Sequence, residues 1–169
     1  MTKRQESQSK KPERPPSRLG SMLCFTVYST AHAFNRAYKP LLDALNLTYP
    51  QYLAMFALWE HDDLTVKQLG ELLHLDSGTL TPLLKRLEAM GLVRRARDTA
   101  DERSVRINLT PAGIEMKGKE RTVHEGLMGA CGQSAEELKA ITAQLVRVRD
   151  GLDVAAARAN APADKTTRT

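Results

Sequence analysis

The chain has 169 residues, of which 41% are hydrophobic, a length that allows one domain of ordinary size with a real core. No apolar run reaches membrane-spanning length and no signal peptide precedes the fold, so we expect a cytoplasmic protein without membrane contact. The formal net charge of +5 suggests a nucleic-acid partner, but residues 1–18 carry four of those five charges. We expect this segment to be a disordered basic tail that adds non-specific affinity.

The first predicted elements after the tail are helices. One extends over residues 23–38, and a shorter one covers residues 40–45. A third helix opens at Thr48, because Thr48 and Gln51 have the spacing of a capping box, and it runs to about Trp59.

A pair of short amphipathic helices is predicted next. Thr65 and Gln68 form another capping box, so the first helix of the pair starts there. Helical spacing predicts one buried face made of Val66, Leu69, Leu72 and Leu73. The pattern breaks after residue 73, and Asp76 or Ser77 caps the second helix.

The second helix of the pair has an apolar line and a polar face. The apolar line consists of Leu80, Leu83, Leu84 and Leu87. The opposite face carries short hydroxyls that suit base edges and cations that suit phosphates: Ser77, Thr79, Thr81, Lys85 and Arg86. We interpret Pro82 as a local irregularity, since the leucine pattern continues through it, and Gly91 as the end of the helix.

After Gly91 the apolar period changes to that of a β-hairpin. Residues 105–109 alternate as a half-buried strand, residues 92–97 supply the partner strand, and residues 98–103 form the tip. The hairpin carries Arg94, Arg95, Arg97, Arg103 and Arg106. Taken alone, a solvated ribbon with edge charges explains these arginines equally well. Attached to the helix pair, the hairpin is better interpreted as a DNA-contacting wing, with Asp101 holding the side chain of Arg103.

The remaining elements are helical. Thr110 and Pro111 start a long helix toward Leu127, and a capping box at Ser134 and Glu137 starts the last one. Helical spacing in that last helix is kept by Leu138, Ile141, Leu145, Val148 and Leu152. Residues 155–169 are expected to be a disordered tail.

The pattern as a whole predicts a mainly α fold with a small β-hairpin, arranged as a winged helix-turn-helix at about 50–110. This motif lies inside a single domain at 19–154, and helices at about 19–47 and 111–154 flank it. Amphipathic helices at both ends need a partner, and a second copy of the chain is the economical one. A two-fold homodimer reads palindromic double-stranded DNA.

Four segments, LCFTVY, AYKPLLDALNLTYPQYLAMFALWEH, LDSGTLTPLLKRLE and DERSVRINLT, resemble the MarR family of dimeric winged-helix regulators. Within that family they are similar to the organic-hydroperoxide sensors of the OhrR group. The resemblance runs from about Leu23 to Leu152. It implies a repressor that leaves its operator when organic hydroperoxide oxidises a cysteine in the first helix, and the matching residue is Cys24.

The chemistry of Cys24 agrees with this implication. If Ser21 caps the first helix, Cys24 lies in the first turn, where free N–H groups favour a thiolate. A helix start near residue 17 weakens that argument, and an isolated cysteine is more often a small buried core residue. The resemblance adds three tyrosines whose hydroxyls donate to the thiolate: Tyr28 from the same helix, and Tyr38 and Tyr49 from the partner subunit.

Cys131 is the second thiol, in the sequence GACGQS between the last two helices. The resemblance is to the two-cysteine members of the group, and it implies that Cys131 resolves the oxidised Cys24 as a disulfide. An incidental loop thiol remains the alternative.

Other chemistries have less support in the sequence. The four histidines are scattered without metal-ligand spacing, so neither a metal nor a cofactor is expected. Two further hypotheses stay open beside the peroxide-responsive repressor. One is a MarR-type regulator that binds a small aromatic anion without thiol chemistry, and the other is a thiol peroxidase in which Cys24 turns over.

Overall fold

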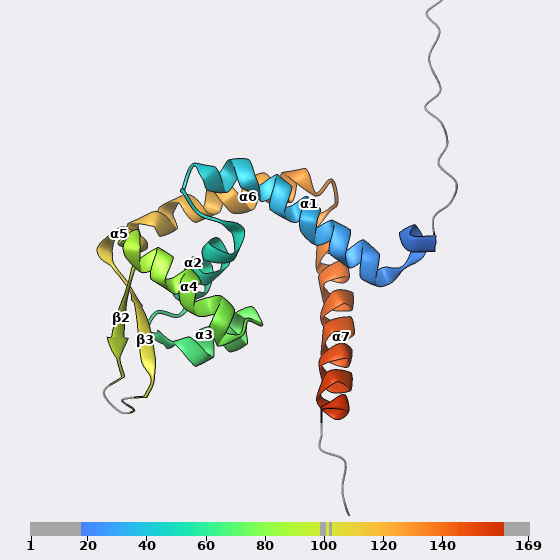
Figure 1. The fold of residues 1–169 in the computed structure, drawn as a ribbon. Helices are drawn as coiled ribbons and strands as arrows, with labels where there is room; N and C mark the ends of the chain where they lie inside the picture. The colour runs from blue at the N-terminus through green and yellow to red at the C-terminus, as the bar shows by residue number, and fades with distance from the viewer. Residues whose placement is uncertain (1–17, 99–100, 102, 161–169) are drawn as a thin grey trace, which may run out of the picture. The chain divides into compact units, whose positions relative to one another are not determined.

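The computed structural model describes residues 18–98, 101 and 103–160 (Figure 1). Residues 1–17 of the basic tail expected at 1–18, and residues 161–169 of the tail expected at 155–169, lie outside the described residues, whereas Arg18 is the first residue of η1. The elements are η1 (Arg18–Ser21), α1 (Leu23–Asp43), α2 (Tyr49–Glu60), β1 (Leu64–Thr65), α3 (Val66–Leu73), α4 (Ser77–Ala89), β2 (Val93–Arg97), β3 (Val105–Leu109), α5 (Pro111–Met116), η2 (Lys117–Lys119), α6 (Glu120–Ala130) and α7 (Ala135–Ala159). They form two compact units, one that ends at Val123 and one that begins at His124.

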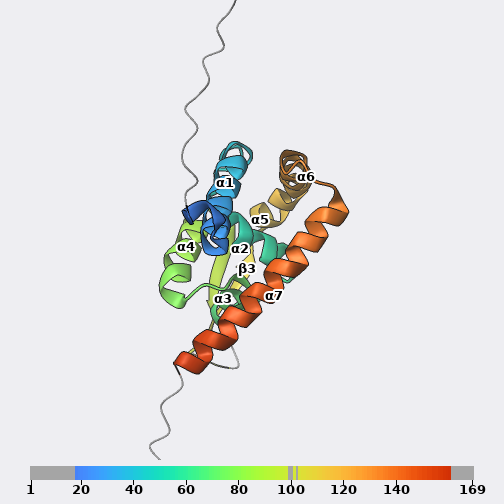
Figure 2. The same ribbon diagram turned by 90° about the vertical axis from the view of Figure 1, so that its right-hand side faces the viewer.

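The core of the first unit lies between α2, α3, α4 and the small sheet (Figure 2). Helix α2 is apolar on nearly every side, and most of its residues are buried. The largest fully buried side chains of this unit are Leu42, Met55, Leu58, Leu69, Leu80, Leu84, Leu87, Val93 and Ile107. The predicted apolar line of the second short helix is therefore confirmed at three positions, while Leu83 is half-buried.

Local capping fixes the two short helices, as the sequence predicts. The Thr65 N–H donates to Gln68 Oε1 at 2.8 Å and the Gln68 N–H to Thr65 Oγ1 at 3.1 Å, which completes the capping box. Between α3 and α4 the chain turns at His74, whose φ of 52° is left-handed. Asp76, rather than Ser77, is the N-cap of α4.

The sheet is antiparallel with the order β1-β3-β2. Val93 pairs with Leu109 and Arg97 with Val105, so the hairpin has the strands expected for a wing. The short strand β1 pairs Leu64 with Ile107, which ties the hairpin to the start of α3. We call residues 93–109 the wing; its strands extend away from the helices in Figure 1.

Several boundaries differ from the prediction. Helix α1 continues through Pro40 to Asp43, because the burial of Leu42 holds its last turn in place despite the missing N–H donor. Pro82 likewise lies inside α4, as predicted. Leu72 is 53% exposed although it was expected in the core, since α3 is two turns long and only Leu69 is fully buried.

The C-terminal helices also differ from the expected pattern. The long helix predicted from Thr110 is divided into α5 and α6 by the 3-10 turn η2. Helix α7 has the predicted capping box at Ser134 and Glu137, and it continues to Ala159 instead of ending at about residue 154. Residues 155–159 are therefore helical and not part of a tail.

Candidate functional site

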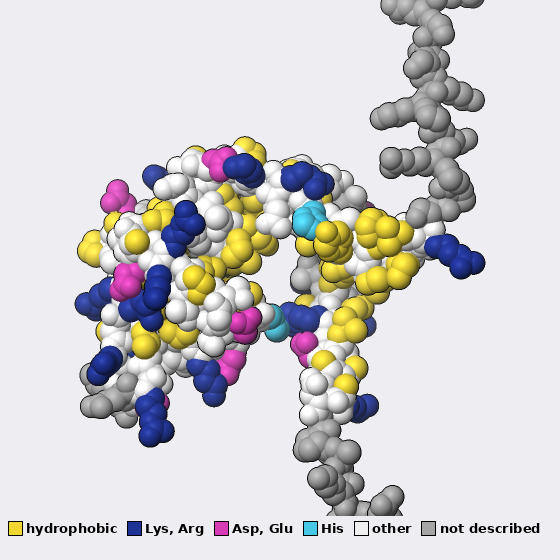
Figure 3. Space-filling model, viewed as in Figure 1, with side chains coloured by type: hydrophobic (Ala, Val, Ile, Leu, Met, Phe, Trp, Pro, Cys, Tyr) yellow, Lys and Arg dark blue, Asp and Glu magenta, His cyan; other side chains and the backbone are white. Residues whose placement is uncertain are grey.

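The outer face of α4 presents most of the polar side chains that the sequence singled out. Ser77, Thr79, Lys85 and Arg86 are exposed, and Thr81 is half-buried. Figure 3 shows Lys and Arg side chains spread over the face that α4 and the wing present. This arrangement joins short hydroxyls near a helix N-terminus with cations further along, as a phosphate- and base-contacting helix requires.

Thr79 is also hydrogen-bonded to Asp76, the N-cap residue of α4. Its N–H donates to Asp76 Oδ1 at 3.0 Å, and its Oγ1 donates to Asp76 Oδ2 at 2.9 Å. These hydrogen bonds lower the pKa of Asp76. The Thr79 hydroxyl therefore offers an outside partner its oxygen as an acceptor while its proton is bonded within the cap.

The wing adds exposed arginines, and its turn is fixed by Asp101. Asp101 Oδ1 accepts from the Arg103 backbone N–H at 3.0 Å, and Asp101 Oδ2 accepts from Ser104 Oγ at 2.8 Å. Asp101 thus fixes the backbone at Arg103, and its predicted hold on the Arg103 side chain stays a prediction. The Arg95 N–H donates to Glu88 Oε1 at 3.1 Å, which connects β2 to α4.

Cys24 is an exposed free thiol at the second position of α1. The N-cap of α1 is Met22, so the helix starts at neither of the two positions that the sequence left open, Ser21 and residue 17, and Met22 makes no side-chain capping bond. Ser21 instead ends η1, where its Oγ donates to the Arg18 carbonyl at 2.9 Å. Cys24 still lies in the first turn, where backbone N–H groups without helical partners favour a negative charge.

The three predicted tyrosines fall into two places. Tyr28, one turn after Cys24, is 61% exposed and contacts His32 with ring centroids 4.4 Å apart. Tyr38 is buried, and its ring lies 4.6 Å from that of Tyr49. On α1, Cys24 and Tyr38 are fourteen positions apart, which is about 21 Å of helix rise. A single chain therefore does not bring Cys24 to the Tyr38–Tyr49 pair.

Tyr52 is a neighbour of this pair that the sequence reasoning missed. Its ring is 5.8 Å from that of Tyr38, and the side chain is buried. Burial, with the nearby charges of Glu120 and Tyr49, raises the pKa of Tyr52 to about 12, so its hydroxyl keeps its proton at neutral pH. The signal was present, because Tyr49 and Tyr52 are three residues apart on one helix face.

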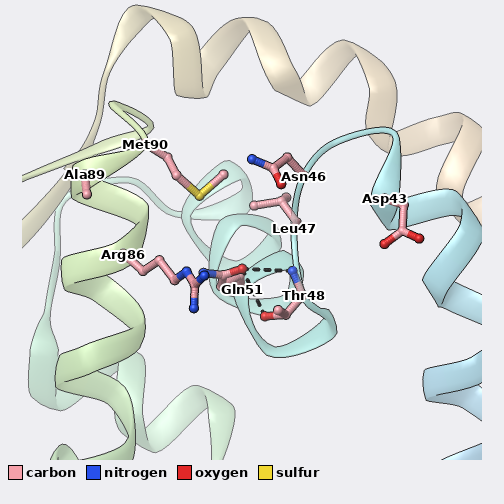
Figure 4. Close-up of a pocket in the computed structure, with 8 residues that line it drawn as sticks. All are labelled: Asp43, Asn46, Leu47, Thr48, Gln51, Arg86, Ala89 and Met90. Carbon is pink, nitrogen blue, oxygen red and sulfur yellow. Dashed lines mark hydrogen bonds between the residues drawn. The ribbon is translucent and has the colours of Figure 1, made fainter.

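A cleft of about 640 Å³ lies between the α1–α2 connection and the end of α4. Its lining consists of Asp43, Asn46, Leu47, Thr48, Gln51, Arg86, Ala89 and Met90. In Figure 4 the Arg86 side chain extends from α4 toward Gln51, whose Oε1 accepts from the Thr48 N–H at 2.8 Å. Arg86 therefore lines this cleft as well as the polar face of α4.

Cys131 follows α6 in the second unit and is half-buried. Its N–H donates to the Leu127 carbonyl at 3.1 Å, and Gly132 after it has a left-handed φ of 63°. Among the described residues, no group of three or more His, Cys, Asp or Glu side chains is placed to hold a metal ion. Within the same ranges, no helix combines the length and the apolar character needed to cross a membrane.

Comparison with known families and proteins agrees with this geometry. Residues 36–119 match the family model described as transcriptional regulator SarA/Rot. The chain is 50% identical to the HTH-type transcriptional regulator TtmR of Methylorubrum extorquens (strain PA1), over 90% of this chain and 78% of the relative. It is 49% identical to the organic hydroperoxide resistance transcriptional regulator of Bacillus subtilis (strain 168), over 80% of this chain and 92% of the relative.

The fold is similar to solved structures of AbfR, a protein of Staphylococcus epidermidis. The overoxidised AbfR bound to DNA has a TM-score of 0.66 and 35% identity, covering 80% of this chain and 95% of that one. The disulfide form of AbfR has a TM-score of 0.57 and 37% identity, and the match covers 76% of this chain and 93% of that one.

Proposed function

This chain belongs to the MarR family of winged-helix transcriptional regulators, and we propose that it is a DNA-binding repressor that organic hydroperoxides inactivate. The observation that carries the DNA-binding part is the combination of the exposed polar face of α4 with the arginine-bearing wing. A helix of this kind enters the major groove while a wing lies over the backbone. As a regulator of genes, the protein acts in the cytoplasm and is not an enzyme.

The binding unit is a homodimer, and two regions support this assignment. Exposed apolar side chains lie in η1, at the N-cap and first turns of α1, and along α7: Leu19, Met22, Leu23, Val27, Ile141, Leu145, Val148 and Leu152. An α7 of 25 residues without a buried residue needs a partner surface to cover its apolar positions. A two-fold dimer presents two copies of α4 to an inverted repeat whose half-sites are about one helical turn apart.

The signal is an organic hydroperoxide, and the group that reacts is the Cys24 thiolate. The sulfur attacks the terminal oxygen of the hydroperoxide, the O–O bond breaks, and an alcohol leaves once the alkoxide has taken a proton. Cys24 is thereby oxidised to a sulfenic acid. Its exposure and its place in the first turn of α1 support this role. In the dimer, Tyr28 of the same chain and Tyr38 and Tyr49 of the other stabilise the thiolate by hydrogen bonds.

Cys131 then resolves the sulfenic acid. Its thiol forms a disulfide with Cys24 and water leaves, so the oxidation becomes reversible by thiols. A disulfide needs the two Cα atoms within roughly 7 Å of each other, and reaching that geometry shifts the helices that hold the two copies of α4 at operator spacing. The solved disulfide form of AbfR supports such a state for a protein of this fold.

A second candidate function rests on the cleft beside Arg86. Its volume of about 640 Å³ is within the range of small-molecule sites, and Arg86 supplies a cation for an aromatic anion. In that case the regulator responds to a ligand and Cys24 is not required.

One experiment separates these functions. A duplex selected from a random library by the reduced protein is titrated with wild type and Cys24→Ser, with and without cumene hydroperoxide. We expect both proteins to bind the duplex equally and only wild type to be released, because serine cannot form a sulfenic acid.

Release of Cys24→Ser at wild-type doses contradicts the sensor mechanism. Equal release of both proteins by salicylate, with no response to peroxide, favours the ligand-binding regulator. Consumption of many peroxide equivalents per subunit favours a thiol peroxidase.

A further inference from the structure

Arg106 differs from the other described arginines of the wing because its guanidinium is hydrogen-bonded to acidic side chains. Arg106 Nε donates to Asp98 Oδ2 at 2.7 Å, and Arg106 Nη1 donates to Asp63 Oδ2 at 2.9 Å and to the Asp63 carbonyl. One fork thus joins three segments: strand β3, the end of β2, and the connection between α2 and β1. These ion pairs raise the pKa of Arg106, with the Asp98 hydrogen bond as the largest cause.

The acidic partners are held as firmly as the arginine. Asp98 is only 8% exposed, and its Oδ1 also accepts from the Asp101 N–H at 3.3 Å. Asp63 Oδ1 accepts from Asn108 Nδ2 at 2.7 Å, on the same strand as Arg106. Asp63 has a left-handed φ of 60°, a conformation that costs energy for most residues and that surrounding bonds must maintain. Asp62 adds a further hydrogen bond between the α2–β1 loop and strand β3, because its Oδ1 accepts from the Leu109 N–H at 2.9 Å.

The hydrogen bonds of Arg106 with Asp98 and Asp63 link the wing to the segment that leads into α3. Asp63 directly precedes β1, and β1 leads into α3. Asp98 lies at the end of β2, at the base of the turn that carries Arg103, and its N–H donates to the Ser104 carbonyl at 2.9 Å. Fixing Asp98 and Asp63 to one guanidinium therefore fixes the direction in which the wing leaves the helices.

We propose that Arg106 is a positioning residue, which sets the angle of the wing through Asp98 and Asp63 so that Arg103 reaches DNA, and that it is not itself a phosphate contact. The proposal rests on the DNA-binding function proposed above. It adds that the wing arginines have different roles: Arg103 contacts DNA, and Arg106 positions the wing. Two carboxylates outweigh the single positive charge of Arg106, so this group offers a phosphate no net attraction.

The proposal and a direct phosphate contact predict opposite signs for the acidic partners. Asp98→Asn and Asp63→Asn each remove a negative charge near DNA, so Coulomb attraction alone tightens binding. If the acids position the wing, both variants bind the selected duplex about fivefold or more weakly, the effect of losing one charged wing contact. Asparagine tolerates a left-handed φ, which makes Asp63→Asn a mild change of the backbone.

Three variants of Arg106 and Arg103 complete the test by duplex titration over a range of salt concentrations. Arg106→Lys keeps the charge but cannot reproduce the two-sided fork, so it binds about as weakly as Arg106→Gln. Arg106→Gln lowers the slope of log affinity against log salt by no more than Arg103→Ala does, and by nothing further in the Arg103→Ala background, whereas Lys85→Gln, the matched phosphate control, lowers it by about one in either background. In the Arg103→Ala background, Arg106→Gln has no further effect, because both act through one contact.

Several results would contradict the positioning role of Arg106. Rescue by Arg106→Lys, a further fall of the salt slope when Arg106→Gln is added to Arg103→Ala, additive losses of affinity in that double variant, or tighter binding by Asp98→Asn each make Arg106 a direct contact. Hydrogen exchange on the free dimer gives a readout without DNA: faster exchange of the 93–97 and 105–109 amides is expected in Arg106→Gln. Failure of wild type to bind any duplex contradicts the proposed function, while unchanged exchange contradicts the positioning role alone.

Discussion

Gly113 offers a prediction whose size can be worked from the structure, because it stands where α5 meets the base of the wing. A Cβ built on Gly113 lies 2.1 Å from the Leu92 carbonyl oxygen, and real Cβ atoms essentially never approach closer than 3.0 Å. In Gly113→Ala the two backbones must therefore separate by at least the 0.9 Å difference between these distances. The obstacle is a backbone carbonyl, so no side-chain rotation relieves it.

The separation strains bonds that hold the same junction. The Leu92 carbonyl accepts from the Thr110 N–H at 3.1 Å, and the Gly113 carbonyl accepts from Trp59 Nε1 at 2.8 Å in the core. Overpacking of this kind costs about 1–3 kcal/mol, and weakening a buried hydrogen bond costs about 1 kcal/mol more. Alanine returns up to about 1 kcal/mol through its helix propensity. We expect a net loss of about 2 kcal/mol in the free energy of unfolding.

Urea unfolding followed by circular dichroism measures this loss, with all proteins at one concentration because a dimer's stability depends on it. Gly129→Ala in α6 is the matched control, since a Cβ there meets nothing within 4 Å. The free energy of unfolding of Gly129→Ala should equal that of wild type or exceed it by up to about 1 kcal/mol. A midpoint of Gly113→Ala at or above the wild-type value refutes the close-approach argument.

Three further outcomes are expected. Arg103→Ala should weaken duplex binding by at least about 1 kcal/mol at matched salt, and equal affinity would contradict its role as a wing contact. Tyr38→Phe and Tyr49→Phe should slow Cys24 oxidation at neutral pH while keeping DNA affinity, as stopped-flow peroxide reaction and duplex titration can test. Cys131→Ser should still release DNA but accumulate overoxidised Cys24 by mass spectrometry; full thiol-reversible release, with no crosslinked dimer in wild type, would leave Cys131 without a resolving role.

Elements that depend on neighbouring residues could be read from the sequence. The capping boxes at Thr65 and Ser134 involve side chains three residues from the backbone groups they satisfy, and both are present in the structure. The strand at 105–109 and the leucine line of α4 are also local patterns; the strand is present with Ile107 buried, and the leucine line is buried at Leu80, Leu84 and Leu87. The resemblance of several segments to one family then identified the fold as a whole.

Features that depend on distant residues were decided only by the tertiary structure. Sequence pattern alone grouped Arg106 with the DNA-contacting arginines, but its partner Asp63 lies 43 residues away, and only the packing of β1 against β3 brings the two together. Leu72 had the spacing of a core residue and is exposed, because spacing defines a helix face without defining what covers it. Periodicity and capping are short-range properties, whereas the partner of a charge and the cover of a face depend on where the folded chain returns.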